Sequence, residues 1–240
     1  MPPTIAVLSY HKIGSPPREG WLTWNYVAED VFRSHLSWFS ERGWSFLSAQ
    51  KFTEGLADPT TLPDRSVLIT FDDAYRSILT VALPILQEFS APAVVFLPTS
   101  YAGGTNTFDT GFEPTEHIMN WEELATLDAA EVSVESHGVS HRAFSSLGSL
   151  ECYAELADSR DSIRLHLKKE SLFFAFPYGD TGQYVTPLST EAAGYQAAFL
   201  YGGGPFCPQD KKGAFLPRLA IGSDSDLDKM MLPVIERPAV

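Results

Sequence analysis

The sequence predicts an α/β fold, and within that class a (β/α) barrel, from two observations. Segments that suit buried strands alternate with segments that suit helices seven or eight times along the 240 residues, the order expected of a parallel sheet covered by helices. No glycine-rich dinucleotide fingerprint follows any predicted strand, which weakens an open doubly wound sheet as the alternative. A closed barrel is therefore favoured, and we expect residues 1–240 to form a single domain.

The individual elements follow from short apolar runs and from helical spacing. In the first half, we expect strands at residues 4–9, 44–47, 66–71 and 92–97, and helices at 27–42, 49–56 and 75–89. Pro84 falls inside the last of these helices and can kink it. In the second half, we expect strands at 132–136, 172–176, 196–200 and 216–221, and helices at 121–127, 150–168 and 189–192. Residues 14–23 and 98–120 are predicted loops, and the length of the second suggests a function.

The composition of the chain limits the partners that it can bind and the cell compartment in which we expect it. The formal net charge of −13 would repel phosphate backbones, so we expect no nucleic-acid partner. No stretch approaches ~18 consecutive apolar residues, so no transmembrane segment is predicted. The first residues carry no secretory signal. This predicts a cytoplasmic protein as written, or an extracytoplasmic one if the chain is a processed form.

Polar side chains stand at the C-terminal ends of four predicted strands. These are His11 after the first strand, Asp72 and Asp73 after residues 66–71, His137 after residues 132–136, and Pro177 with Tyr178 after residues 172–176. An aspartate pair alone is more typical of a strand-end turn. Because barrel sites form at the C-terminal ends of the strands, however, their convergence on one face predicts a functional site.

Asp73, His137 and His141 predict a metal site. They supply one oxygen and two nitrogen ligands, and three protein ligands leave room for water, as in catalytic sites. The two histidines are four residues apart, a spacing that a helical turn would place on one side. Such a ligand set also fits non-haem iron oxygenases. Those enzymes do not need a second adjacent aspartate, so Asp72 favours hydrolysis instead.

Hydrolysis would give roles to two further residues. A metal lowers the pKa of bound water towards ~7, and Asp72 can then accept its proton as general base. The departing nitrogen needs an acid, and His11 is the remaining histidine at the end of a predicted strand. A hydrogen-bonded structural histidine is the alternative for His11. His35 and His166 fall in predicted helices and are expected to face solvent, and His117 is expected to be a bystander.

These residues resemble the polysaccharide deacetylases, carbohydrate esterase family 4. Thr70-Phe71-Asp72-Asp73 resembles the first motif of the family, His137 to His141 the second, and Phe176-Pro177-Tyr178-Gly179 the third. The resemblance implies an α/β fold, a distorted (β/α) barrel with seven or eight parallel strands. It also implies Asp72 as the base and one divalent metal ion on Asp73, His137 and His141, most often Zn²⁺, with Co²⁺ or Ni²⁺ as alternatives.

The N-terminal Ser9-Tyr10-His11-Lys12-Ile13 is similar to the branch that contains bacterial poly-N-acetylglucosamine deacetylases. In that branch the corresponding histidine is the general acid, a role that the resemblance implies for His11. The resemblance also implies that the backbone amide of Tyr178, which follows Pro177, helps to stabilise the oxyanion.

The chain departs from the family pattern at three points. Gly138 stands where the second motif usually has Ser or Thr, so a supporting hydroxyl is missing. The third motif lacks the Arg that braces the catalytic Asp. Arg218, on the last predicted strand, is a candidate replacement, with a surface ion pair as its alternative. The biofilm enzymes of the family act outside the cytoplasm, whereas no export signal is visible here.

We therefore expect a metal-dependent hydrolase that removes N-acetyl groups from an N-acetylated sugar, an oligomer or polymer of N-acetylglucosamine. A deacetylase or deformylase of another small or lipid-linked amide, and a non-catalytic carbohydrate-binding relative, stay open as alternatives. Because sugar rings stack on aromatic rings, Phe108 and Phe112 of the long loop are expected to bind substrate. Trp121, at the end of that loop, is a further candidate, with a core role as its alternative.

Overall fold

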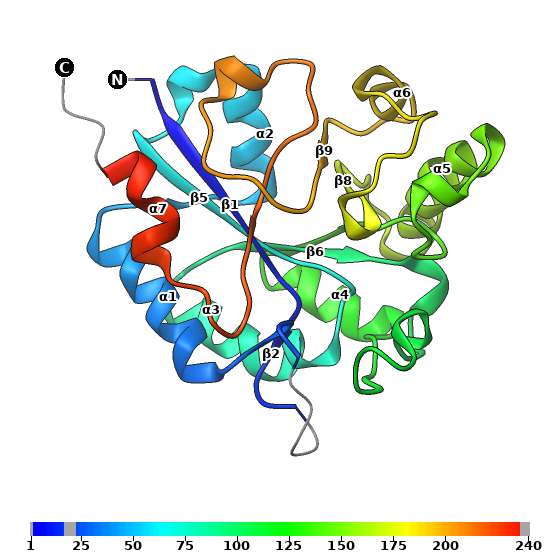
Figure 1. Ribbon diagram of the computed structural model, residues 1–240, viewed down its shortest axis with the longest axis horizontal. Coiled ribbons are helices and arrows are strands. Elements are labelled where there is room, and N and C mark those ends of the chain that lie inside the picture. The colour runs from blue at the N-terminus through cyan, green and yellow to red at the C-terminus, as the bar shows by residue number, and fades with distance from the viewer. Residues whose placement is uncertain (1, 17–22, 236–240) are drawn as a thin grey trace.

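A curled sheet of parallel strands, with helices packed around it, forms the framework of the molecule (Figure 1). The computed structural model describes residues 2–16 and 23–235, so residues 17–22 of the predicted loop at 14–23 lie outside the described residues. The strands of this sheet are β1 (Thr4–Tyr10), β4 (Ser45–Phe46), β5 (Arg65–Phe71), β6 (Ala93–Leu97), β7 (Val132–Ser136), β8 (Phe173–Ala175), β9 (Ala197–Phe199) and β10 (Leu219–Ala220).

The strand order is β10-β1-β5-β6-β7-β8-β9, and β4 also pairs with β5. All of these pairs are parallel. A single parallel bridge, Phe199 with Leu216, spans the seam between β9 and the chain leading into β10. The prediction of a distorted (β/α) barrel is therefore confirmed. Two short strands, β2 (Lys12–Ile13) and β3 (Tyr26–Val27), form a separate pair beyond the end of β1.

The helices follow the strands in chain order. They are α1 (Glu29–Glu41), α2 (Ala49–Ala57), α3 (Leu83–Glu88), α4 (Trp121–Ala129), α5 (Ser149–Leu167), α6 (Pro187–Ala192) and α7 (Leu227–Ile235). A wide π-turn over Ile78–Ala82 precedes α3, and Pro84 lies in the first turn of α3, so the helix predicted at 75–89 is divided there. None of the described helices is long and apolar enough to span a bilayer.

Successive side chains of a strand point to opposite faces of the sheet, and this alternation produces two separate hydrophobic layers. Ala6 and Leu8 of β1 face the layer between the sheet and the outer helices, whereas Ile5 and Val7 belong to the layer shared with α2. Phe52 of α2 packs in this second layer. Helix α2 lies near the beginning of β1, away from the end where β1 leads into β2 (Figure 1). This arrangement leaves the C-terminal ends of the strands for the site.

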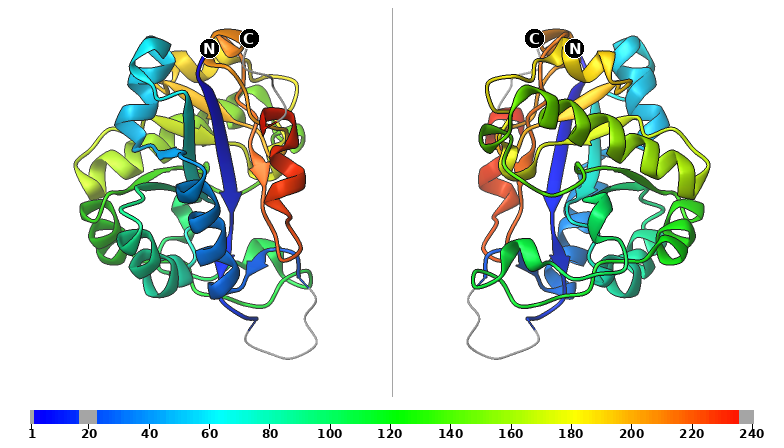
Figure 2. Two further views of the ribbon diagram at one scale, coloured as in Figure 1. Left: turned by 90° about the vertical axis from the view of Figure 1, so that its left-hand side faces the viewer. Right: turned by 90° about the vertical axis from the view of Figure 1, so that its right-hand side faces the viewer.

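Helix α7, which the sequence analysis did not predict, packs beside α1. Trp38 of α1 donates from its indole nitrogen to Asp228 Oδ1 at 2.7 Å, and Arg42 pairs with the same carboxylate at 3.4 Å. In Figure 2, α1 and α7 flank β1 on either side. The helix layer is thereby continued across β1, next to the seam of the barrel.

Candidate active site and metal centre

Asp73, His137 and His141 come together just beyond the C-terminal ends of β5 and β7. Their candidate ligand atoms all lie within 4.8 Å of one another, and the three residues are buried. Asp73 Oδ1 is 3.1 Å from His141 Nε2 and 3.6 Å from His137 Nε2. The structure therefore assembles the cluster that the sequence predicts as a metal site.

The donor atoms of this cluster fit a divalent cation. Asp73 Oδ1 is buried and accepts no hydrogen bond of good geometry within the described residues, a costly state for a carboxylate oxygen unless a positive charge compensates it. His137 Nδ1 lies 2.7 Å from the carbonyl oxygen of Ala175, an outer contact typical of metal-binding histidines. Burial lowers the pKa of His137 to about 4, so its ring is neutral and able to coordinate a metal at neutral pH.

An irregular backbone, and not a helix, brings the ligands together. The expectation that a helical turn carries both histidines is wrong, because residues 137–141 form a non-helical turn. Within it, Gly138 (φ 81°) and His141 (φ 56°) adopt left-handed conformations. Seven described residues other than glycine have a positive φ, and three of them, Asp73, His141 and Tyr178, are predicted site residues. Such uncommon conformations are typical of functional sites.

Glu155 of α5 supports this turn, a contact that the sequence analysis missed. Its Oε2 accepts hydrogen bonds from the backbone amides of Val139 (2.6 Å) and Ser140 (3.0 Å). The Ser140 hydroxyl donates to the other carboxylate oxygen. A Cβ at Gly138 would lie only 2.7 Å from Glu155 Oε2. Glycine at this position therefore makes room for the carboxylate, which supports the turn where the family pattern has a hydroxyl.

Arg218 forms a buried, two-pronged ion pair with Asp72. Its terminal nitrogens donate to Asp72 Oδ1 at 2.6 Å and to Oδ2 at 2.8 Å, and the Ser9 hydroxyl adds a bond to Oδ2 at 3.2 Å. Because Arg218 is 0% exposed, the alternative of a surface ion pair is wrong. Burial alone would raise the pKa of Asp72, but the charge and hydrogen bonds of Arg218, together with the nearby His137 and His11, outweigh it, and the pKa lies below its ordinary value. Asp72 is therefore an ionised carboxylate held in one orientation.

His11 lies directly after β1, on the same rim of the barrel. It interacts electrostatically with both Asp72 and Asp73. Its Nδ1 is buried and has no hydrogen-bonding partner within residues 2–16 and 23–235. The ring meets the edge of Tyr201, with ring centres 5.7 Å apart. The contacts thus place His11 beside the two aspartates, whereas its proton-transfer role stays a prediction.

The rings of two predicted site residues contact the metal-ligand candidate His141. Phe108 from the long loop stacks on the imidazole, with centres 4.0 Å apart and planes 27° apart. Tyr178 meets the imidazole edge-on at 4.9 Å and is 56% exposed, while Pro177 beside it is buried. Phe112 lies on the surface, farther along the same loop, and is 83% exposed. Phe108 and Tyr178 therefore border the cluster.

The structure places two other residues differently from the sequence analysis. The ring of Trp121 stacks on that of His166 from α5, with centres 4.1 Å apart and planes 4° apart, so Trp121 packs between helices instead of against the cluster. His35 was expected to face solvent but is buried, with Nδ1 3.1 Å from the Tyr10 hydroxyl. It stabilises the packing of α1 against β1.

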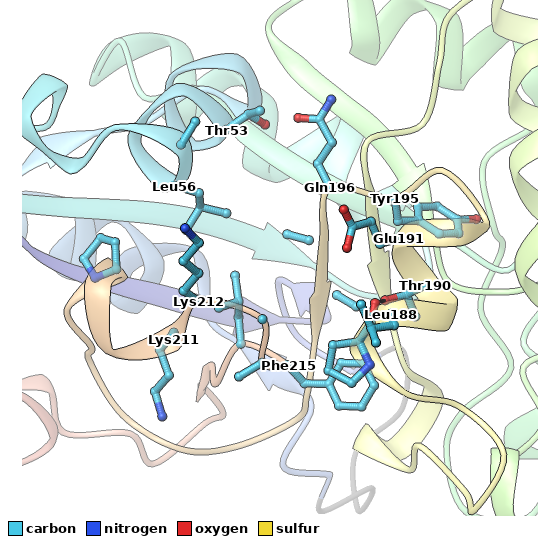
Figure 3. Close-up of a pocket in the computed structure, with 18 of the residues that line it drawn as sticks. Thr53, Leu56, Leu188, Thr190, Glu191, Tyr195, Gln196, Lys211, Lys212 and Phe215 are labelled. Atoms are coloured by element: carbon cyan, nitrogen blue, oxygen red, sulfur yellow. Dashed lines mark hydrogen bonds between the residues drawn. The ribbon is translucent and has the colours of Figure 1, made fainter.

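A cavity of about 580 Å³ lies apart from this cluster, and no predicted site residue lines it. Figure 3 shows Thr53 and Leu56 of α2, together with Lys212, on one side, and Leu188 and Glu191 of α6 on the other. Residues 194–198 also contribute to its wall, and they include the N-terminal end of β9. The candidate ligands, in contrast, all follow the C-terminal ends of strands.

A comparison with known families identifies this framework. A family model described as polysaccharide deacetylase matches residues 60–198, which include the aspartate pair, the histidine pair and the turn at Tyr178. The chain belongs to the polysaccharide deacetylase family. Members of this family are metal-dependent, and this polysaccharide deacetylase offers Asp73, His137 and His141 as a ligand set.

Individual relatives are distant. This polysaccharide deacetylase is 24% identical over 195 residues to the Bacillus subtilis protein YxkH, which is named for the same family, covering 81% of this chain and 63% of that protein. It is 26% identical over 159 residues to a poly-β-1,6-N-acetyl-D-glucosamine N-deacetylase of Staphylococcus epidermidis, covering 65% of this chain and 55% of the relative. The chain therefore spans less than two thirds of the length of these relatives.

A solved structure shares the whole fold. The Streptococcus pyogenes deacetylase PplD, determined in complex with acetate, superposes with a TM-score of 0.81 at 21% identity, covering 97% of this chain and 98% of PplD. The shared fold therefore also includes most of the chain before residue 60 and after residue 198, which the family model does not match.

Proposed function

We propose that this polysaccharide deacetylase is a metal-dependent N-deacetylase that hydrolyses the acetamido groups of N-acetylglucosamine oligomers or polymers. The observation that carries the proposal is the ionised Asp72, fixed by Arg218 beside the buried cluster of Asp73, His137 and His141. A base next to a three-ligand metal site is the arrangement that metal-assisted hydrolysis needs. The named activity of the Staphylococcus epidermidis relative supports the choice of sugar.

Asp73, His137 and His141 would hold one divalent ion, with Zn²⁺ as the first candidate and Co²⁺ or Ni²⁺ as alternatives. Two imidazoles and one carboxylate form a common donor set for catalytic zinc. When bound, such an ion lowers the pKa of water and polarises the amide carbonyl. The short distances from Asp73 Oδ1 to both histidines support a shared occupant.

Asp72 would accept a proton from the attacking water. Arg218 and Ser9 engage both of its carboxylate oxygens, and these bonds restrict its rotation. Oδ1, which accepts only one of these bonds, retains a lone-pair site for a further hydrogen bond. A fixed orientation matters because proton transfer requires hydrogen-bonding distance between the base and the water.

The remaining steps would use the backbone of Tyr178 and the side chain of His11. The amide of Tyr178, in a left-handed turn after Pro177, would donate to the carbonyl oxygen as negative charge develops there. His11 would protonate the nitrogen as the C–N bond breaks, giving acetate and a free amine. Phe108 and the exposed Phe112 would offer apolar faces to sugar rings.

The proposal is tested by measuring acetate release from a panel of N-acetylated sugars, including chitin oligomers and β-1,6-linked N-acetylglucosamine oligomers. Each assay is run on metal-free protein and after addition of Zn²⁺ or Co²⁺. We expect release from at least one oligomer that depends on added metal. Metal-loaded protein that releases no acetate from any sugar, but hydrolyses another N-acyl or N-formyl amide, would overturn the sugar assignment and favour the alternative amide hydrolase.

A further inference from the structure

The long loop between β6 and α4, residues 98–120, is anchored at its base to both segments that carry the candidate metal ligands. At its beginning, the amide of Ser100 donates to the carbonyl oxygen of Val139 at 3.0 Å, within the histidine turn. At its end, the amide of Met119 donates to the carbonyl oxygen of Ala74 at 3.0 Å, next to Asp73. The base of the loop is therefore fixed relative to the metal centre.

The tip of this loop, residues 104–116, carries the ring that touches the site. Phe108 stacks on His141 with ring centres 4.0 Å apart. Asn106, buried inside the tip, donates to one backbone carbonyl on the returning limb at 3.0 Å and accepts from the amide of Glu116 at 2.7 Å. These bonds tie the two limbs together, so we expect the tip to move as one unit.

Glu113 ties this tip to the segment that follows His11. Its Oε2 lies 2.9 Å from Lys12 Nζ, and its Oε1 accepts a hydrogen bond from Asn25 Nδ2 at 2.9 Å. The side chain of Lys12 is only 1% exposed and that of Glu113 only 10%. The ammonium also lies over the ring of Tyr75, 4.5 Å from its centre. Because a buried charge is costly without its partner, displacement of the tip would leave Lys12 unpaired.

A second bond reinforces this connection. The hydroxyl of Tyr26 in β3 donates to Glu116 Oε1 at 2.5 Å. Lys12 and Tyr26 are register partners in the β2–β3 pair, so the tip is fastened to one small sheet at two points. The strand β2 of this small sheet begins at Lys12, directly after the proposed acid His11.

We propose that Glu113 is a substrate-positioning residue. Through Lys12 it holds the tip that carries Phe108 at a fixed distance from the segment that carries His11, and so sets the opening through which a sugar chain reaches the metal centre. The kind of substrate in this inference rests on the proposed function. The connection of the loop tip to Lys12 through Glu113, called the tether below, does not depend on that function. A substrate that spans the opening should depend on Glu113, whereas a small substrate should not.

The kinetic test uses Glu113→Gln, which keeps the shape of the side chain and removes its charge. Glu88→Gln is the matched control, because it removes the exposed ion pair with Arg33 on the outer helices α1 and α3. We measure kcat and KM for an N-acetylglucosamine oligomer and for 4-nitrophenyl acetate, together with bound metal. For Glu113→Gln we expect kcat/KM on the oligomer to fall by up to about 100-fold, mainly through KM, the scale seen when a substrate is slightly misplaced.

With the small ester, Glu113→Gln should act like the wild type and like Glu88→Gln, with unchanged metal content. An equal loss on oligomer and ester would overturn the proposal, because Glu113 would then only support the fold. Unchanged kinetics on both substrates would overturn it as well. If the wild type itself releases no acetate from any oligomer, the proposed function fails, and the tether is then decided by a measurement without substrate.

That measurement is backbone hydrogen exchange of the tip. In Glu113→Gln, amides of residues 104–116 should exchange faster, while those of β7 keep the rates of the wild type; unchanged tip exchange would contradict the tether. A double variant, Lys12→Met with Glu113→Gln, guards against simple misfolding, since it leaves no unpaired buried ammonium. It should recover the thermal stability that Glu113→Gln loses, but not the oligomer KM. Recovery of KM as well would show that the ion pair is dispensable for positioning.

Discussion

At the scale of single residues, the behaviour of the proposed base depends on a partner 146 positions away in the chain. Arg218 satisfies both oxygens of Asp72 and offsets the cost of burying its charge. Burial raises the pKa of Asp72, whereas Arg218 and the neighbouring histidines lower it, and the lowering contributions prevail together. Asp72 is thus both ionised and fixed, the two properties that a general base needs at neutral pH.

Replacement of Arg218 should therefore cost stability as well as activity. In Arg218→Met the Asp72 carboxylate would stay buried without its cationic partner, and we expect a loss of about 3–5 kcal/mol in the free energy of unfolding. Arg218→Lys keeps the charge but loses the two-pronged geometry. It should therefore lose less unfolding free energy than Arg218→Met, while its turnover stays slow. Denaturant unfolding of both variants checks this order. Equal stability of wild type and Arg218→Met would show that the ion pair contributes nothing to the fold.

His11 is the second residue whose role can be separated from its place in the structure. As general acid it matters only when the leaving group needs a proton. His11→Ala should then keep its bound metal and hydrolyse an amide slowly, with a much smaller loss on an activated ester. The ratio of the two rates, measured on one protein preparation, checks this. A parallel loss on amide and ester would assign His11 to substrate positioning or to folding.

At the scale of elements, helix α5 shapes the ligand turn through a single carboxylate. Glu155 accepts bonds from Val139, Ser140 and the Ser140 hydroxyl, between the two histidines. The turn is irregular, and two of its residues have left-handed backbones. Contacts behind metal ligands set the orientation of those ligands and so tune affinity.

Glu155→Ala should accordingly weaken metal binding without removing a ligand. We expect the Kd for Zn²⁺ to rise by about 10- to 100-fold, the usual effect of losing such an outer contact. Competition with a chromophoric chelator measures this, and Glu151→Ala, on the exposed first turn of the same helix, is the control. A Kd equal to that of the wild type would mean that the turn holds its shape without Glu155.

At the scale of the whole molecule, the barrel could be predicted because its signals are local. Alternating strand and helix patterns appear within short windows, and so do the polar residues that end the strands. Contacts that join distant parts of the chain have no such signal. Arg218 could be named as a partner of Asp72 only through the resemblance to the family, and the pair Lys12–Glu113 arises only when the fold brings its two segments together. Tyr201, whose ring meets His11, belongs to the same class.

Other differences have local or steric explanations. His35 lies three residues after Phe32 and four before Phe39, so helical spacing already places it on the buried face of α1. The burial of His35 is therefore encoded locally in the sequence. The stacking of Trp121 on His166 joins two helices and could not be anticipated. The short apolar run of α7 contains Pro233, a poor residue for a helix interior. The single-domain boundaries and the cellular compartment stay predictions.

The most direct test of the account compares Asp72→Asn with the wild type at equal metal content. Both proteins are loaded with Zn²⁺, bound metal is quantified, and acetate release is followed on the best N-acetylglucosamine oligomer. Because Asp72 supplies the base and not a metal ligand, the variant should bind one ion per chain and lose about 10²–10⁴-fold in rate. A metal-loaded Asp72→Asn protein that deacetylates at the wild-type rate would contradict the assignment of Asp72 as the base.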